Sequence, residues 1–141
     1  TGGRLEGYPS DMTRVGFFGT PTAEFEKVHA IVNMAVEAAL AAAKPGVLAK
    51  SIDKAARDVI ADAGYGDFFT HRTGHGLGID IHEPPYLTAT SETVLDEGMV
   101  FSIEPGIYLP GQFGLRLEEI VILRKDGAEI LSDLPRAALV R

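Results

Sequence analysis

The chain has 141 residues and a formal net charge of −7, with 45% hydrophobic and 23% charged residues, which is an ordinary composition for a globular protein. Lysine and arginine form no basic run, so nucleic acid is not an expected partner, and the absence of cysteine excludes disulfides and thiolate metal sites. No apolar run reaches the roughly 18 residues of a membrane span and no signal peptide is recognisable. We therefore expect a cytoplasmic protein without a membrane partner.

A strand and a long helix are predicted in the first third of the chain. Residues 7–11 are turn-rich, and residues 13–18 are rich in the β-branched and aromatic side chains typical of a β-strand. Thr20 and Pro21 predict a helix N-cap followed by proline at the first helical position. Apolar residues at helical spacing then continue this helix to about Ala43.

A second helix and several strands are predicted in the remainder. The helix runs from about Ser51 to Ala63, and Gly64 is placed to end it. Apolar segments between glycines and prolines then predict strands at residues 77–81, 99–103 and 115–123, the last one long. A hairpin turn is expected at residues 125–127. Helices followed by strands indicate an α+β fold, with the strands in an antiparallel sheet.

Four side chains of metal-ligand type interrupt this apolar pattern: Asp11, His75, Glu104 and Glu118. Each alone has an ordinary explanation, such as a turn residue, a structural histidine or a solvent-facing glutamate. Carboxylates are rarely fully buried, however, unless they are paired or bind a metal. Together the four form a nitrogen and oxygen ligand set that suits Mn, Zn, Co or Fe. Carboxylates that bridge two cations about 3.5–4 Å apart are a known hydrolytic arrangement.

Two other interpretations of the glycine-rich segment are rejected. His71 and His75 have the spacing of a zinc-binding pair on a helix, but Gly74, Gly76 and Gly78 argue against a helix there. The same glycines are a weak signal for a phosphate-binding loop, because no helix follows them.

Beyond these patterns, four segments together resemble a known enzyme family: residues 7–14, 71–85, 95–108 and 114–119. They resemble the creatinase/aminopeptidase P/prolidase group of dinuclear metallopeptidases, which shares the pita-bread fold with methionine aminopeptidases. The resemblance covers nearly the whole chain in order. It implies that residues 1–141 are the C-terminal part of the catalytic domain, with two helices packed on a curved antiparallel sheet.

The resemblance also implies a metal-binding role for each of the four residues. Asp11 and Glu118 would each contact both metals, whereas His75 and Glu104 would serve one of them. The cofactor would be two divalent ions, with manganese favoured and cobalt or zinc as alternatives.

The resemblance implies roles for three further residues, two on the substrate side and one beside the metal carboxylates. His82 would contact the substrate and the developing tetrahedral intermediate, and His71 would line the same pocket. Arg116 would lie beside the metal carboxylates and orient them. Glu104 would also be the proton shuttle, so the expected catalytic residues are Glu104, His82 and His71.

One departure from the family pattern concerns the fifth ligand, an aspartate in an Asp-x-Gly-Gly segment. Residues 1–3 match x-Gly-Gly, so the aspartate would directly precede Thr1. The first half of the pita-bread domain and any separate N-terminal domain would also lie outside these residues. We therefore expect the chain alone to bind at most one metal tightly and to be nearly inactive.

The expected function of the intact protein is hydrolysis of the Xaa-Pro bond at the N-terminus of dipeptides or short peptides, with a proline-containing peptide as partner and a homodimer as assembly. A methionine aminopeptidase-like enzyme is the nearest alternative; its pattern has glutamine in place of Arg116. A catalytically inert binding module of the same fold is the other alternative, and it predicts lost ligands, whereas four are retained here. Creatinase itself is disfavoured by the retained ligands.

Overall fold

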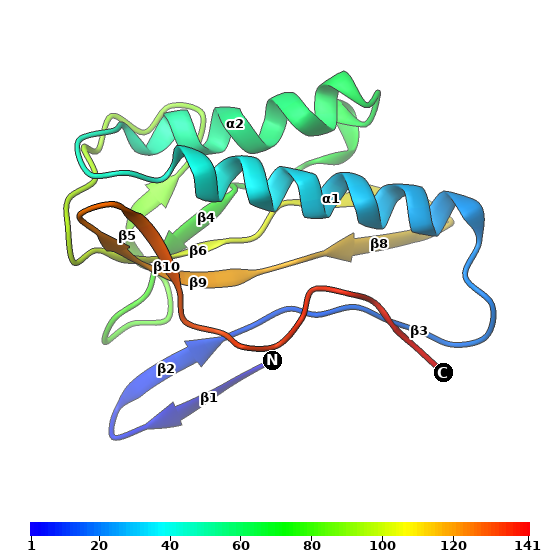
Figure 1. Ribbon diagram of the computed structural model, residues 1–141, viewed down its shortest axis with the longest axis horizontal. Helices are drawn as coiled ribbons and strands as arrows, with labels where there is room; N and C mark the ends of the chain where they lie inside the picture. The colour runs from blue at the N-terminus through cyan, green and yellow to red at the C-terminus, as the bar shows by residue number, and fades with distance from the viewer.

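The computed structural model describes residues 1–141 as two α-helices over a set of short strands (Figure 1). The helical elements are α1 (Ala23–Ala42), α2 (Ala49–Asp62) and the 3₁₀ helix η1 (Gly66–Phe68). The strands are β1 (Gly2–Leu5), β2 (Tyr8–Asp11), β3 (Gly16–Phe17), β4 (Gly74–Gly76), β5 (Glu83–Leu87), β6 (Val100–Ile103), β7 (Gly106–Leu109), β8 (Phe113–Arg116), β9 (Glu119–Arg124), β10 (Gly127–Ile130) and β11 (Leu139–Val140).

The central layer is a five-stranded sheet in the order β10-β9-β6-β4-β5, in which all neighbouring strands are antiparallel. Helices α1 and α2 lie side by side over one face of this sheet, while the β1–β2 hairpin and both termini lie on its other side (Figure 1). Two further pairs complete the fold, the antiparallel hairpin β7–β8 and the parallel pair β3–β11. The expected α+β class, with two helices on an antiparallel sheet, is confirmed.

The core lies between the helices and the sheet, as a cluster of 24 buried residues. Helix α1 contributes a continuous buried stripe of apolar side chains, among them Val28, Val32, Ala35 and Ala39. The small alanines let α2 pack closely beside it. Neither helix has the length and hydropathy that a bilayer-spanning segment requires.

The helix boundaries differ slightly from those predicted. The N-cap of α1 is Thr22, whose Oγ1 accepts a hydrogen bond from the amide of Phe25 at 3.1 Å. The expected cap at Thr20 is therefore wrong: the helix begins beyond Pro21, because the next threonine satisfies an amide of the first turn. Helix α2 begins at Ala49, two residues earlier than expected, and Gly64 follows it with φ of 87°, as its predicted role in ending the helix requires.

The strand predictions are correct at residues 99–103 and at the hairpin between β9 and β10, partly correct at residues 13–18 and 115–123, and wrong at residues 77–81. Residues 77–81 form a bent loop rather than a strand, and the strand expected at residues 13–18 shrinks to β3. The long strand expected at residues 115–123 is two strands, because β8 pairs with β7 whereas β9 pairs with β6 and β10. Glu118 lies at this break. Its amide donates to the Thr13 carbonyl at 3.2 Å instead of to a carbonyl of a neighbouring strand of the sheet.

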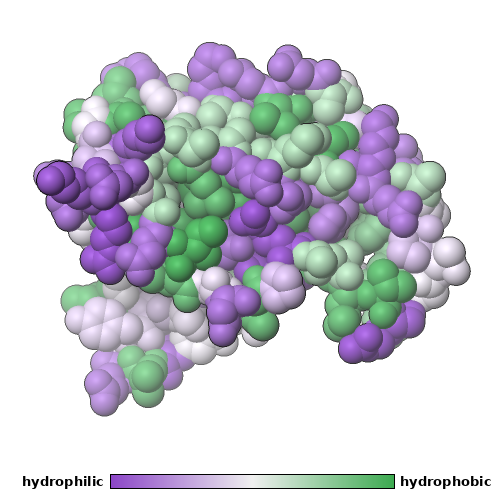
Figure 2. Space-filling view, in the orientation of Figure 1, coloured by the Kyte–Doolittle hydropathy of each residue, from purple (hydrophilic) through white to green (hydrophobic).

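Polar residues gather on the surface over α2, whereas hydrophobic residues gather near the C-terminal end of the chain (Figure 2). The exposed apolar side chains of that region include Phe18, Leu139 and Val140. The helix layer thus turns its polar face to solvent, as expected for amphipathic helices packed on a sheet.

The glycines of β4 are required by close approach of the backbone. A Cβ on Gly74 would lie 1.9 Å from the carbonyl oxygen of Ser102, and a Cβ on Gly76 would lie 2.3 Å from that of Pro84. The glycines therefore let β4 lie tightly between β5 and β6, which is a packing role and not phosphate binding.

This packing gives the first prediction. We expect Gly74→Ala to destabilise the protein by about 3 kcal/mol, at the upper end of overpacking costs, because the obstructing atom is backbone and cannot rotate away. The control is Gly16→Ala, whose Cβ meets nothing closer than the Leu139 carbonyl oxygen at 3.7 Å. Urea unfolding of both variants measures the difference. Equal midpoints for the two variants would show that β4 shifts without cost.

Candidate metal centre

The four predicted ligands converge from separate parts of the fold. Asp11 ends β2, His75 is the middle residue of β4, Glu104 directly follows β6, and Glu118 occupies the break between β8 and β9. His75, Glu104 and Glu118 are buried, and Asp11 is half-buried. The antiparallel pairing of β4 with β6 and of β6 with β9 brings the last three together in the centre of the sheet.

Two overlapping groups of ligand atoms result. His75, Glu104 and Glu118 form the buried group, with one atom from each lying within 4.8 Å of the others. The Nε2 atom of His75 lies 3.2 Å from Oε1 of Glu104. Asp11, His75 and His82 form the second group, within the same limit.

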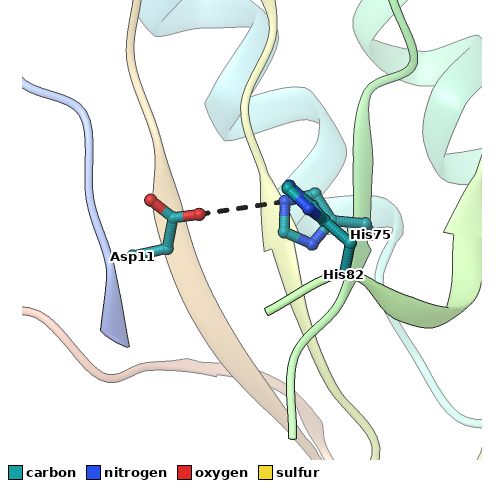
Figure 3. A group of neighbouring side chains, drawn as sticks. All are labelled: Asp11, His75 and His82. Carbon is teal, nitrogen blue, oxygen red and sulfur yellow. Dashed lines mark ion pairs between the residues drawn. The ribbon is translucent and has the colours of Figure 1, made fainter. Parts of the chain in front are cut away.

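Figure 3 shows the second group, with the Asp11 carboxylate pointing at the His75 imidazole and the His82 ring beside it. The Oδ2 atom of Asp11 lies 4.0 Å from Nε2 of His75, and the two imidazole centroids are 4.2 Å apart. His75 is therefore shared by both groups. The sequence assigned His82 only to the substrate, but its position also gives it the reach of a ligand.

The orientation of His75 is fixed by its surroundings. Its Nδ1 lies 3.0 Å from the Gly76 carbonyl oxygen, to which a protonated Nδ1 donates, so Nε2 is directed at the carboxylates. Ser102 Oγ accepts the amide of His75 at 3.0 Å and donates to Oε1 of Glu104 at 3.1 Å. A metal-binding histidine is usually held in this way: its second ring nitrogen donates to an acceptor such as a backbone carbonyl, and the carboxylate ligands beside it are themselves hydrogen-bonded.

The strongest sign of a cation site is an unsatisfied oxygen on Glu118. The side chain is 1% exposed, and its Oε2 accepts a hydrogen bond from Thr13 Oγ1 at 2.7 Å. Its Oε1 is buried and has no hydrogen-bond partner. A buried acceptor without a donor is costly, and a divalent cation beside His75 and Glu104 would supply the missing partner. The residues present therefore fit a metal of the Mn, Co or Zn type.

The pKa values of the buried group reflect three ionisable side chains held close together away from water, two of them carboxylates that a cation would stabilise. Burial raises the pKa of Glu118, and the nearby Glu104 and Asp11 charges add to this, against the Thr13 hydrogen bond. Burial opposes the ionised form of Glu104 as well, but its hydrogen bond to His75 and the charges of His75 and Arg116 hold its pKa below the usual value. Burial likewise disfavours charged His75, but the hydrogen bonds to Glu104 and to the Gly76 carbonyl, together with the charge of Glu104, outweigh it and raise the pKa of the imidazole.

A pocket of about 400 Å³ opens beside these ligands, lined by His71, Arg72, His82, Glu104 and Arg116. The Nε atom of Arg116 lies 3.5 Å from Oε2 of Glu104, opposite the oxygen that faces His75. His71 and His82, expected on the substrate side, and Arg116, expected beside the metal carboxylates, thus share one pocket with Glu104, the expected proton shuttle.

Three polar residues of the site escaped the sequence analysis: Thr13, Ser102 and Tyr108. Thr13 Oγ1 contacts Glu118 and also accepts from Arg116 Nη2 at 3.2 Å, while Tyr108 Oη lies 2.9 Å from Nε2 of His71. Thr13 and Ser102 stand two residues from Asp11 and Glu104, the spacing that shares a face along an extended chain. That spacing is the signal by which they could have been found.

A second buried carboxylate, Glu119, is tied to the opposite side of β9. Both its oxygens lie 3.0 Å from Nη2 of Arg14, and Arg136 Nη1 lies 3.4 Å from Oε1. Arg14 Nη1 also donates to the carbonyl oxygen of Glu118. Glu119 therefore has full ionic partners, in contrast to its neighbour Glu118.

Comparison with known proteins agrees with this geometry. The profile of metallopeptidase family M24 matches residues 1–125. The chain is 47% identical over 134 residues to a probable dipeptidase PepE of Mycobacterium tuberculosis, covering 95% of the chain and 36% of the relative. It is 48% identical over 122 residues to an Xaa-Pro dipeptidase of Lactobacillus delbrueckii subsp. lactis, covering 86% and 33%.

A solved structure, the X-Pro aminopeptidase of Thermotoga maritima, superposes with a TM-score of 0.97 at 47% identity over 99% of this chain and 40% of that one. The chain thus spans about 33–40% of the length of these relatives. On the extent of the profile match, the chain belongs to metallopeptidase family M24.

Proposed function

We propose that the protein containing this chain is a dinuclear metallopeptidase that hydrolyses the Xaa-Pro bond at the N-terminus of dipeptides or short peptides. The observation that carries the proposal is the unpartnered Oε1 of Glu118, buried within ligand distance of His75 and Glu104. The relatives described as Xaa-Pro dipeptidase and X-Pro aminopeptidase support the substrate class. Manganese is the proposed metal, with cobalt or zinc as alternatives, because a donor set of carboxylates and imidazole without sulfur suits all three.

Asp11, His75, Glu104 and Glu118 are the residues proposed to hold the ions. When bound, divalent ions supply Lewis acidity, which makes water a competent nucleophile near neutral pH. The remaining work falls to the chain's own side chains. Glu104 would accept the proton of the attacking water and deliver it to the proline nitrogen, which cannot leave as an amide anion.

The substrate side of the pocket has complementary roles in this proposal. His82, exposed beside His75, would donate to the oxyanion that develops on the scissile carbonyl. His71 would contact the peptide from the other side of the pocket, with Tyr108 on its Nε2. Arg116 would hold Oε2 of Glu104, which leaves the Oε1 side to the ligand cluster.

The fifth ligand expected before Thr1 is also part of the proposal. In the β1–β2 hairpin Gly2 pairs with Asp11, and the Thr1 nitrogen lies 2.6 Å from the Met12 carbonyl oxygen. A preceding residue that continued this ladder would stand opposite Thr13, on the same face as Asp11. An aspartate there would face the group that Thr13 and Glu118 form.

The test is an assay on the full-length protein containing these residues. We expect hydrolysis of Ala-Pro by the manganese-loaded protein, loss of at least 95% of the activity with EDTA, and recovery on adding Mn²⁺. Cleavage of Met-Ala-Ser in preference to Ala-Pro would favour the methionine aminopeptidase alternative. A protein that binds Mn²⁺ and cleaves neither peptide would overturn the proposal in favour of a binding module.

A further inference from the structure

The segment from Phe69 to Thr73 connects the helix layer to the candidate site. It follows η1 and enters β4, and it carries His71, with His75 only two residues beyond its end. The whole segment is outside any helix or strand, so no regular hydrogen-bond ladder fixes the path of its backbone. Other contacts must hold it: at its end the Thr73 amide donates to the Leu87 carbonyl oxygen of β5 at 3.0 Å, and side chains of α2 hold the rest.

Asp53 of α2 is the first of two side chains that hold this segment. Its side chain is fully buried, and all its hydrogen bonds are directed at two partners. Oδ1 accepts the amide of Thr73 at 3.2 Å and its hydroxyl at 2.8 Å, while Oδ2 accepts Nε of Arg57 at 2.7 Å. A buried carboxylate needs such complete satisfaction to be tolerated.

Arg57, one turn later on the same helix, is the second of these side chains. Its Nη1 donates to the carbonyl oxygen of Phe69 at 3.0 Å, and its Nη2 donates to that of His71 at 2.5 Å. The guanidinium also lies 4.2 Å from the centroid of the Phe69 ring. The fork of one arginine thus spans the segment at two carbonyls, a geometry that lysine cannot reproduce.

The held segment is joined directly to the site. The carbonyl oxygen of Thr73 accepts the amide of Glu104 at 2.7 Å, so the residue that Asp53 fixes also fixes the proposed proton shuttle. His71, whose carbonyl Arg57 fixes, presents Nε2 to Tyr108 at 2.9 Å. The path from α2 is therefore one hydrogen bond long to His71 and two hydrogen bonds long to Glu104.

We infer that Asp53 and Arg57 are positioning residues for the reaction, which set the places of His71 and Glu104 without touching the substrate. The inference rests on the proposed function, because it assigns work to the same pocket. A merely stabilising pair is the weaker explanation, since a buried ion pair is often no more stable than apolar residues of similar volume. Apolar residues could not, however, fix the directions of three backbone groups of this segment, which are the carbonyls of Phe69 and His71 and the amide of Thr73.

The chain provides its own matched control for the test. Lys54 and Asp58 form an i,i+4 pair on the same helix, at 2.5 Å, with exposed side chains and no bond to the segment. The variants are Asp53→Asn and Arg57→Lys, with Asp58→Asn as control. Thr73→Val and its conservative partner Thr73→Ser test the hydroxyl bond by itself and serve if the Asp53 variant does not fold. Ile60→Ala, on the buried side of α2, controls for lost stability alone.

Two measurements are made on the full-length protein. Steady-state kinetics with Ala-Pro give kcat and KM per folded molecule. NMR of the imidazole nitrogens of the metal-free protein reports the His71–Tyr108 bond, with His29, which contacts the Arg136 carbonyl, as an internal reference. Signals are assigned by single His→Gln substitutions.

We expect Asp53→Asn, Arg57→Lys and Thr73→Val to lower kcat about 10- to 100-fold, as small misplacements of reacting groups do, and to shift the His71 signals but not those of His29. Thr73→Ser, Asp58→Asn and Ile60→Ala should keep kcat within twofold. Unmoved His71 signals with unchanged kcat in the Arg57 and Thr73 variants would overturn the inference and leave the pair a stabilising one. If the wild type cleaves no Xaa-Pro peptide, the proposed function fails, while the NMR comparison still decides whether the pair positions His71.

Discussion

Replacing Glu118 by glutamine is expected to abolish tight metal binding and yet to leave the metal-free protein at least as stable as the wild type. Burial raises the pKa of Glu118, so the folded protein retains this proton to a higher pH than the unfolded chain does. The ionised carboxylate therefore costs stability as pH rises above the unfolded value, and the cost is complete above the folded pKa. Glutamine removes the charge, and with it that cost, at pH 8.

The same substitution removes an anionic oxygen from the metal group. Loss of a residue that merely supports a metal ligand costs about 10- to 100-fold in affinity or activity, so loss of a proposed ligand should cost at least about 100-fold. Thermal unfolding at pH 8, with EDTA and with Mn²⁺, measures both effects. The wild type should gain stability on adding Mn²⁺, and Glu118→Gln should start no lower and gain little.

The adjacent residue supplies the control. Glu119 is equally buried, but it is paired with Arg14 and Arg136, so Glu119→Gln breaks an ion pair and should lower stability by about 3–5 kcal/mol. Its effect on the intrinsic affinity for Mn²⁺ should be small. A change in stability of opposite sign for Glu118→Gln and Glu119→Gln would show that the Glu118 carboxylate lacks a full set of partners, whereas that of Glu119 has them. Equal destabilisation by both would contradict the assignment of Glu118 as a ligand held without a partner.

The sequence predicted this pair of glutamates only in part. The apolar run from Leu115 to Leu123 suggested one strand, in which neighbouring side chains would alternate between faces. Instead the chain changes sheets at Glu118, because β8 completes the β7 hairpin and β9 joins the central sheet. The alternation of apolar residues along a segment does not reveal where the strand that pairs with it changes. The break is what leaves both glutamates buried, one on each side.

Local features of the fold followed the sequence more closely. Gly64 ends α2 and the turn at Gly127 joins β9 to β10, since both depend on backbone conformations that glycine adopts readily. Asp53 and Arg57, by contrast, look in sequence like any exposed i,i+4 pair, and Lys54 and Asp58 beside them are one. Burial of the first pair depends on the tertiary packing of α2 against the segment before β4, which no single-sequence pattern encodes.

Replacing Glu104 by glutamine is expected to lower kcat by about 10²- to 10⁴-fold, the usual range for loss of a general acid–base group, with a much smaller change in KM. Glutamine keeps an oxygen for the ligand cluster and keeps the shape of the side chain, but it cannot carry a proton from water to the proline nitrogen. The assay uses Ala-Pro at saturating Mn²⁺, with the bound metal measured on the same sample.

Metal content decides what a loss of activity means. If Glu104→Gln retains its metal and loses kcat, the residue acts in proton transfer as proposed. Should metal content and activity fall in proportion, Glu104 is only a ligand and the proton must be carried by another group.

The variant Ser102→Ala is expected to have a smaller effect, because it removes the hydrogen-bond donor to Oε1 of Glu104 and leaves the carboxylate in place. We expect about a 10-fold loss of kcat, as for other groups that support a ligand. A Ser102→Ala loss as large as that of Glu104→Gln would mean that orientation of the carboxylate matters as much as its charge.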